Sequence, residues 1–198
     1  MTPPVSKKPK GIILQPDASA FLVRCNTGKY RLSYEANREG RTDPEAFGVL
    51  DKNGNYFVDK EETPITAADI APHAVGDRLF LKERWLRVEY DDWLEGQKTR
   101  YITQSMWSQD VWEAYFETFP HEKFMQARTM YAEIAQGFRE ITSCEVVRVQ
   151  ELTLNLLRKL GFSWVDSFEM YLTKKYTYAA WDNNEYFFYY ELKRIPKL

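Results

Sequence analysis

Residues 82–85, Lys-Glu-Arg-Trp, place two cations, a carboxylate and an indole ring in direct succession. In general, cations contact phosphates, a carboxylate accepts hydrogen bonds from amino groups, and an aromatic ring stacks on a base. The same residues also fit a less specific role, with Trp85 in the core and Lys82 and Arg84 on a solvated strand face. Both interpretations stay open at this point.

Basic residues around this segment are partly offset by acidic ones. The charged side chains are Arg78, Lys82, Arg84, Arg87, Lys98 and Arg100, interleaved with Glu83, Glu89, Asp91 and Asp92. The net charge of the whole chain is −2, so bulk charge does not indicate a nucleic-acid binder. A cationic patch here is small, and we expect any binding through it to be weak and salt-sensitive.

Other catalytic and metal sites find little support. His73 and His121 are isolated, Cys25 and Cys144 lack metal-like spacing and fit reduced thiols, and no glycine-rich phosphate loop is present. We therefore expect no metal and no cofactor. No apolar run approaches the ~20 residues of a membrane span, and no signal peptide is evident, which predicts a cytoplasmic protein without a membrane partner.

Length and composition are those of a globular chain. The 198 residues, 44% apolar and 28% charged, suffice for one large domain that buries roughly 70% of its unfolded surface. We expect a disordered proline- and lysine-rich tail over 1–10 and a single domain over 11–198. The aromatic share, 16%, is high and indicates a ring-rich core.

The elements that must position these side chains are both strands and helices. Asn53-Gly54 between two apolar runs predicts a hairpin, and the alternation after Gly76 predicts a strand through residues 79–81. Helical spacing predicts helices over 109–119 and 121–136, interrupted at Pro120, which together form a helical insertion around 109–136. Further predictions are a strand at 139–152, a short helix ending at Gly161, and a helix from an N-cap at Ser163 to Tyr176.

The last of these elements is the aromatic segment WDNNEYFFYYELKRI, residues 181–195. Its residues alternate between two faces that are both mostly apolar over Tyr186–Tyr190, which predicts a central strand whose hydroxyl groups find hydrogen-bond partners or a solvated rim. Strands and helices in this order predict an α+β fold.

Three segments resemble the ASCH group of phage and prophage proteins, within the PUA-like superfamily. GDRLFLKERW (76–85) is similar to its Gly-Asp-Arg-Leu segment, REITSCEVVRVQEL (139–152) keeps its leading Arg and Val-Arg-Val, and residues 181–195 match its closing pattern without a gap. The resemblance implies a small PUA-like β-barrel with flanking helices, in which the aromatic segment is a covered strand. Three features depart from the family. TGKYRL (27–32) lacks the threonines of its first motif, TMYAEIAQGFR (129–139) keeps only Met130 and Arg139 of its Met-Pro-Arg-Trp segment, and Glu185 replaces a proline.

A PUA-like barrel implies a cleft that receives RNA, single-stranded nucleic acid or a modified base. In that cleft Trp85 would stack on the base, Lys82, Arg84 and Arg139 would contact phosphates, and Glu83 would accept hydrogen bonds from an amino group.

Two alternatives remain open. Some small ASCH proteins are similar to amidohydrolases of N4-acylated cytidine, for which the candidates here are Lys29 or Lys98, Thr99 and Glu83. GQKTRYIT (96–103), which carries Lys98 and Thr99, is otherwise interpreted as an ordinary hairpin strand. Phage relatives labelled as morphogenetic proteins imply an accessory that binds a phage or host protein through aromatic residues of 109–136, such as Trp112 and Phe116, although helical spacing also fits a packing stripe there.

Overall fold

A computed structural model describes residues 9–14, 18–25, 31–34, 43–92 and 96–197. The chain divides into two compact units, each built from separated segments. The first unit comprises Met1–Leu14, Asp77–Glu140 and Arg194–Leu198, and the second comprises Gln15–Gly76 and Ile141–Lys193. The single domain expected over 11–198 stays a prediction. Of the expected tail, residues 1–8 lie outside the described residues, and Lys10 already belongs to a strand.

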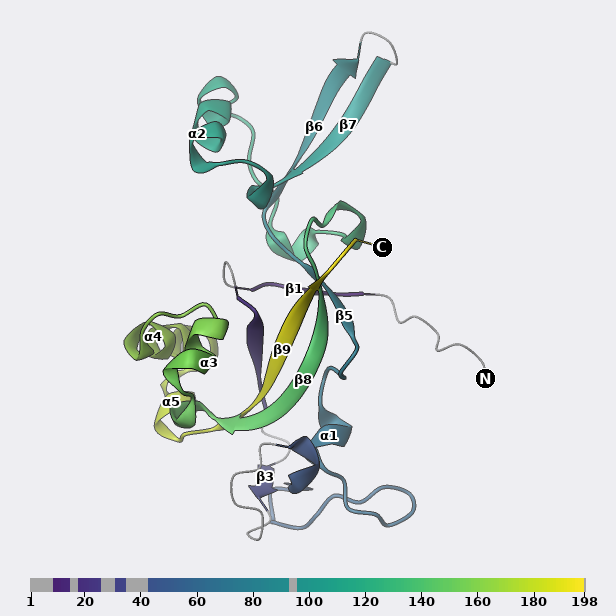
Figure 1. The fold of residues 1–198 in the computed structure, drawn as a ribbon, viewed down its shortest axis with the longest axis vertical. Helices are drawn as coiled ribbons and strands as arrows, with labels where there is room; N and C mark the ends of the chain where they lie inside the picture. Colours follow the sequence, from purple (N-terminus) through teal and green to yellow (C-terminus); the bar gives the residue numbers. More distant parts are fainter. Residues whose placement is uncertain (1–8, 15–17, 26–30, 35–42, 93–95, 198) are drawn as a thin grey trace. The chain divides into compact units, whose positions relative to one another are not determined.

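The fold is α+β, and five strands form its largest sheet (Figure 1). Their order across the sheet is β1 (Lys10–Ile12), β5 (Arg78–Leu81), β8 (Phe138–Arg148), β9 (Tyr186–Ile195) and β2 (Ala20–Arg24). β1 runs parallel to β5, whereas β5 is antiparallel to β8 and β2 to β9. The division between the units passes through β8 and β9. Among the described strands the order is open, with β1 and β2 at its ends, so their pairing does not close a barrel.

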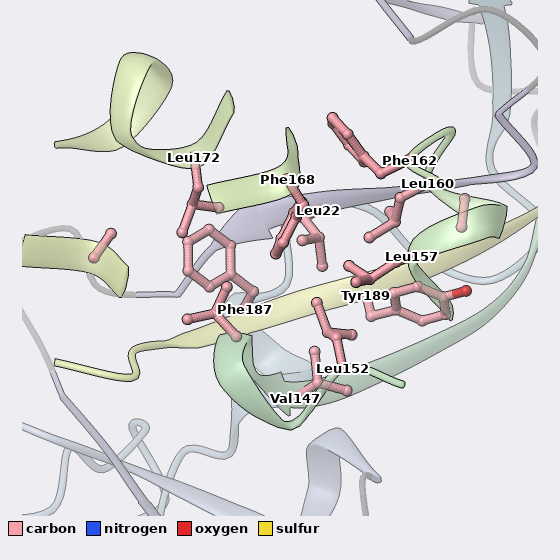
Figure 2. Close-up of a cluster of buried hydrophobic side chains, with 13 residues drawn as sticks. Leu22, Val147, Leu152, Leu157, Leu160, Phe162, Phe168, Leu172, Phe187 and Tyr189 are labelled. Atoms are coloured by element: carbon pink, nitrogen blue, oxygen red, sulfur yellow. The ribbon is translucent and has the colours of Figure 1, made fainter. Parts of the chain in front are cut away.

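β9 confirms the prediction of a central strand in the aromatic segment. It lies between β8 and β2, and its residues Phe187–Tyr190 are all at most 1% exposed. Phe187 and Tyr189 point into a cluster that α3 (Leu154–Lys159), α4 (Val165–Tyr176) and α5 (Tyr178–Asp182) cover (Figure 2). The strand is thus apolar on both faces because helices and loops bury both faces. The hydroxyl group of Tyr189, however, has no hydrogen-bond partner among the described residues, whereas that of Tyr190 interacts with the Cys144 thiol and the backbone of His73.

The second unit also contains β3 (Arg31–Tyr34), β4 (Phe47–Leu50) and α1 (Ala67–Ile70). The predicted Asn53-Gly54 turn is confirmed: Gly54 has a φ of 88°, and an isolated bridge joins Leu50 to Tyr56. Gly161 also adopts the positive φ predicted for it, 87°. α4 begins one residue later than predicted, because Trp164 and not Ser163 is its N-cap.

The first unit holds the hairpin of β6 (Trp85–Asp92) and β7 (Gly96–Thr103), followed by α2 (Gln109–Thr118). The helix predicted over 121–136 is wrong. In its place are two 3-10 turns, Ala127–Thr129 and Ala132–Ile134, and a bridge from Met125 to Trp85. Met130 and Ala135 are buried against Trp85 in this arrangement, so tertiary packing overrides the local helical pattern.

Candidate nucleic-acid interface

Residues 82–84 connect β5 to Trp85, the first residue of β6, and backbone hydrogen bonds fix this segment. Lys82 N donates to Ile12 O at 2.7 Å, which continues the β1–β5 pairing by one residue. Met125 N donates to Trp85 O at 2.7 Å. The segment is therefore held between β1 and the loop that follows α2.

Trp85 lies in a core cluster and not at the surface. Its side chain is 6% exposed and packs with Phe80, Met130, Ala135 and Phe138. Its indole Nε1 donates to Thr129 Oγ1 at 3.3 Å. A base can stack on this ring only after the residues that cover it have moved, so this structure favours the packing interpretation of Trp85 over the stacking one.

Glu83 and Lys82 already have partners inside the first unit. Ser105 donates to the Glu83 carboxylate from its backbone N at 2.7 Å and from its Oγ at 2.9 Å. Lys82 Nζ donates to Arg128 O at 3.0 Å. Arg84, by contrast, is exposed. The polar side chains of 82–85 therefore diverge toward different neighbours and do not converge on one ligand.

The β6–β7 hairpin presents a more open set of cations and rings. In its register Trp85 pairs with Thr103, Arg87 with Tyr101 and Glu89 with Thr99 on one face. The alternate pairs are Leu86 with Ile102, Val88 with Arg100 and Tyr90 with Lys98, and these lie on the other face. The base of that second face packs against Trp112 of α2 through Leu86 and Ile102.

Toward the tip, the second face carries Tyr90, Lys98 and Arg100, which we call the basic face. Tyr90 is 43% exposed, Arg100 is exposed and Lys98 is half-buried. On the opposite face, Arg87 Nη2 lies 2.6 Å from Glu89 Oε1, so an acid offsets that cation. Each face therefore carries an exposed ring beside an exposed arginine, Tyr90 with Arg100 and Tyr101 with Arg87, but on the opposite face Glu89 offsets the arginine.

The residues considered for amide hydrolysis are not assembled. Lys98 and Thr99 are consecutive in β7 and point to opposite faces. Glu83 binds Ser105, beyond the Thr103 end of β7. Thr99 lies four steps along the strand from Thr103, a separation of roughly 13 Å. Lys29 lies outside the described residues. The geometry gives this chemistry no support.

Arg139 lies on β8, opposite Leu79 of β5. It is 8% exposed, and its Nη1 donates to the backbone carbonyl of Phe138 at 3.0 Å. Burial, together with the positive charge of Arg194, lowers the pKa of Arg139. It is not in the set of residues that form the basic face.

The aromatic residues of α2 form a packing stripe. Trp112 is 4% exposed, is in ring contact with Phe116, Phe124 and Tyr115, and donates from Nε1 to Gln104 O at 3.1 Å. Phe119, at 50%, is the exposed ring of this set. Trp112 is therefore not available at the surface, although the partner-binding interpretation needs it there.

Sequence reasoning named the cations of β7 but missed the ring beside them. Tyr90, Lys98 and Arg100 fall on one face as soon as the register of the hairpin is known, so the register would have revealed the set. That register depends on pairing across a turn that composition does not mark. Tyr101, 41% exposed, lies on the opposite face in contact with Trp85.

Within the described part of the chain, no group of three or more His, Cys, Asp or Glu residues is arranged to hold a metal. No helix there is both long and apolar enough to cross a membrane. Compared with protein-family models, with curated proteins and with solved structures, the chain matches none of them.

Proposed function

We propose that this chain binds single-stranded nucleic acid through the basic face of the β6–β7 hairpin. The observation that carries the proposal is the combination of an exposed tyrosine ring, Tyr90, with the cations Lys98 and Arg100 on one strand face. The cations would contact phosphates, and the ring would stack on a base.

The chemistry suits an unpaired strand because its bases are free to stack. Stacking of a base on an aromatic ring is worth about 1–3 kcal/mol and tolerates any base. Two phosphate contacts add an electrostatic contribution that falls as salt rises. A surface of this size supports weak, sequence-tolerant binding.

This proposal moves recognition from the expected cleft at Trp85 to the hairpin. Trp85 is covered, and Glu83 is engaged by Ser105. Arg84, which is exposed, remains a candidate for an additional phosphate contact.

The test is fluorescence anisotropy with a labelled single strand of roughly 12 nucleotides, titrated at several salt concentrations. The double variant K98Q/R100Q should weaken binding about tenfold or more and should reduce the slope of log K against log salt by about 1.4, two contacts at about 0.7 each. Y90A should weaken binding by about 5- to 100-fold, whereas Y90F, which keeps the ring, should bind almost as tightly as the wild-type chain.

The matched control is R87Q, which removes an exposed arginine from the opposite face of the same hairpin. Its affinity should stay within about twofold of the wild-type value, because Glu89 already offsets that charge. Equal losses in R87Q and in K98Q/R100Q would rule out a binding face and leave only nonspecific attraction.

We also infer a distant relationship to the ASCH group, with the five-stranded sheet corresponding to part of a PUA-like barrel. Its support is that the three similar segments fall on β5, β8 and β9, which are neighbours in the sheet. Glu185, where the family has proline, has a local explanation: its backbone N donates to Ala180 O, and its carboxylate accepts two hydrogen bonds from Arg24. A proline would lose both interactions.

A further inference from the structure

The helix α4 has one buried face and one exposed face. Phe168 and Leu172, at 1% and 0% exposed, point into the core cluster (Figure 2). Helical periodicity places a second set of residues on the opposite side of the helix, at the spacing i, i+3, i+4, i+7 and i+8. This set, which we call the outer face of α4, comprises Asp166, Glu169, Met170, Thr173 and Lys174.

The outer face is hollowed, and apolar groups lie exposed in the hollow. It measures about 380 Å³ and is lined by the five residues of the outer face and by Tyr178, the first residue of α5. Met170 is 68% exposed and Tyr178 is 63% exposed. In knobs-into-holes packing, four residues of one helix form a hole that receives a side chain of the facing helix. Residues 166, 169, 170 and 173 have the spacing of such a hole, so the hollow suits the face of another helix.

The charges of the outer face are placed symmetrically about Met170. Asp166 lies four residues before it and Lys174 four residues after it, about 6 Å along the helix axis in each direction. Both side chains are exposed, and neither makes an ion pair or a hydrogen bond with another residue in the described part of the chain. A face with this arrangement is complementary to a reversed copy of itself, because each acid then meets a base.

We propose that the outer face of α4 binds the same face of a second copy of this chain, as an antiparallel pair related by a two-fold axis. In such a pair every contact from residue i to residue j is matched by a contact from j to i. Met170 then lies at the axis and enters the hollow of the other copy, while Asp166 of each copy pairs with Lys174 of the other. Glu169, next to Asp166 on the helix surface, adds a second acid for that lysine.

The interface is small, so the dimer is weak. α4 has 12 residues and is therefore about 18 Å long. One helix pair of this length buries less than the ~1,200 Å² at the lower end of stable interfaces. We expect a reversible dimer with a Kd of about 10–500 µM.

This dimer does not depend on nucleic-acid binding, because the outer face of α4 and the basic face lie in different units. If both proposals hold, K98Q/R100Q loses affinity for an oligonucleotide but dimerises like the wild-type chain. Loss of oligonucleotide binding therefore does not count against the dimer.

The experiment is sedimentation equilibrium of the full chain between about 1 and 500 µM. The average mass of the wild-type chain should rise with concentration from that of one chain toward that of two. M170A changes an exposed side chain, so it should unfold like the wild-type chain at low concentration. It should dimerise about tenfold or more weakly, because each copy loses an apolar contact. V75A, at a side chain 61% exposed outside α4, is the control and should dimerise within about twofold of the wild-type chain.

Charge reversal tests the two-fold pairing itself. D166K places two cations opposite one another at both ends of its dimer, and K174D does the same with two acids. Each should weaken dimerisation about 3- to 30-fold. An equal mixture of D166K and K174D brings opposite charges together at both ends, so it should form a heterodimer about as strong as the wild-type dimer. K52D, the same reversal at an exposed lysine outside α4, is the control and should dimerise like the wild-type chain.

Three results would overturn the proposal. A chain that stays monomeric up to about 500 µM would exclude the dimer and leave the outer face for a different partner. Dimerisation that is unchanged in both M170A and D166K would assign it to another surface. Weaker dimers of D166K and K174D without recovery in their mixture would exclude the antiparallel two-fold arrangement.

Discussion

The Tyr189 hydroxyl group is buried in the core cluster under α3 and α4, without a hydrogen-bond partner among the described residues (Figure 2). A buried hydroxyl without a partner destabilises the folded state by roughly 1–3 kcal/mol. Tyr189→Phe keeps the ring and removes this group, so we expect the free energy of unfolding to rise by about 1 kcal/mol in denaturant titrations. Tyr178→Phe, at a ring 63% exposed, should change it by less than about 0.5 kcal/mol. A lower stability of Tyr189→Phe would show that the hydroxyl is bonded.

Individual side-chain roles were the hardest feature to predict from the sequence. The succession at 82–85 suggested a shared binding site, but Glu83 binds Ser105, which lies 22 positions further along the chain. Trp85 is covered by Met130 and Ala135, from a loop that local pattern assigned to a helix. Tertiary packing decides which residues so distant in sequence come into contact, and the type of a residue does not predict its partner.

The β6–β7 hairpin and α2 stabilise one another through a cluster centred on Trp112. Its buried members are Leu86, Ile102 and Trp112. Because an isolated hairpin is marginally stable in water, we expect Trp112→Ala to lower the stability of this region by about 3–5 kcal/mol. Hydrogen exchange should then accelerate together in 85–92, 97–103 and 109–118. The control is Phe119→Ala, at an exposed ring, which should leave exchange in these three segments nearly unchanged. Unchanged exchange in Trp112→Ala would show that the hairpin is stable without this cluster.

Elements with a strong period were predicted well. The two-residue alternation of 186–192 gave β9 and its two faces, and acidic and basic ends marked α4, whose last turn contains Lys174 and Lys175. The 121–136 prediction failed because its apolar residues pack individually in turns and a bridge. Periodicity cannot distinguish such a loop from an amphipathic helix.

The whole chain should lose stability in mildly alkaline solution. Cys25 is 1% exposed, and burial raises the pKa of its thiol far above the usual range, with a further increase from Cys144. In the unfolded chain this thiol ionises near pH 8.5. Above about that pH the unfolded state releases a proton that the folded state keeps. The free energy of unfolding is therefore unaffected by this thiol below about pH 8.5 and falls by about 1.4 kcal/mol per pH unit above it.

The measurement is the urea midpoint between about pH 8 and pH 10 under reducing conditions. Cys25→Ala should make the decline less steep below about pH 10 without abolishing it, because burial also raises the pKa of the Cys144 thiol. Above about pH 10, ionisation of Tyr189 and Tyr190 in the unfolded chain adds to the decline, since burial raises the pKa of both in the folded state. An equally steep decline in Cys25→Ala below about pH 10 would assign the effect to other groups.

The α+β class followed from the order of the predicted elements, but the division into two units did not. Each unit combines segments far apart in sequence, and β1 pairs in parallel with β5 across more than 60 intervening residues. Such long-range pairings leave no local signature. The inferred resemblance to the ASCH group stays a prediction, and it does not say how the sheet is bounded.

β9 contributes residues to both units. Of the strands in the large sheet it is the last to be synthesised, so on the ribosome neither unit has its full set of strands until residues 186–195 have left the exit tunnel. Until then the backbone edges of β2 and β8 that pair with this strand stay unpaired, and an unpaired strand edge is prone to aggregation.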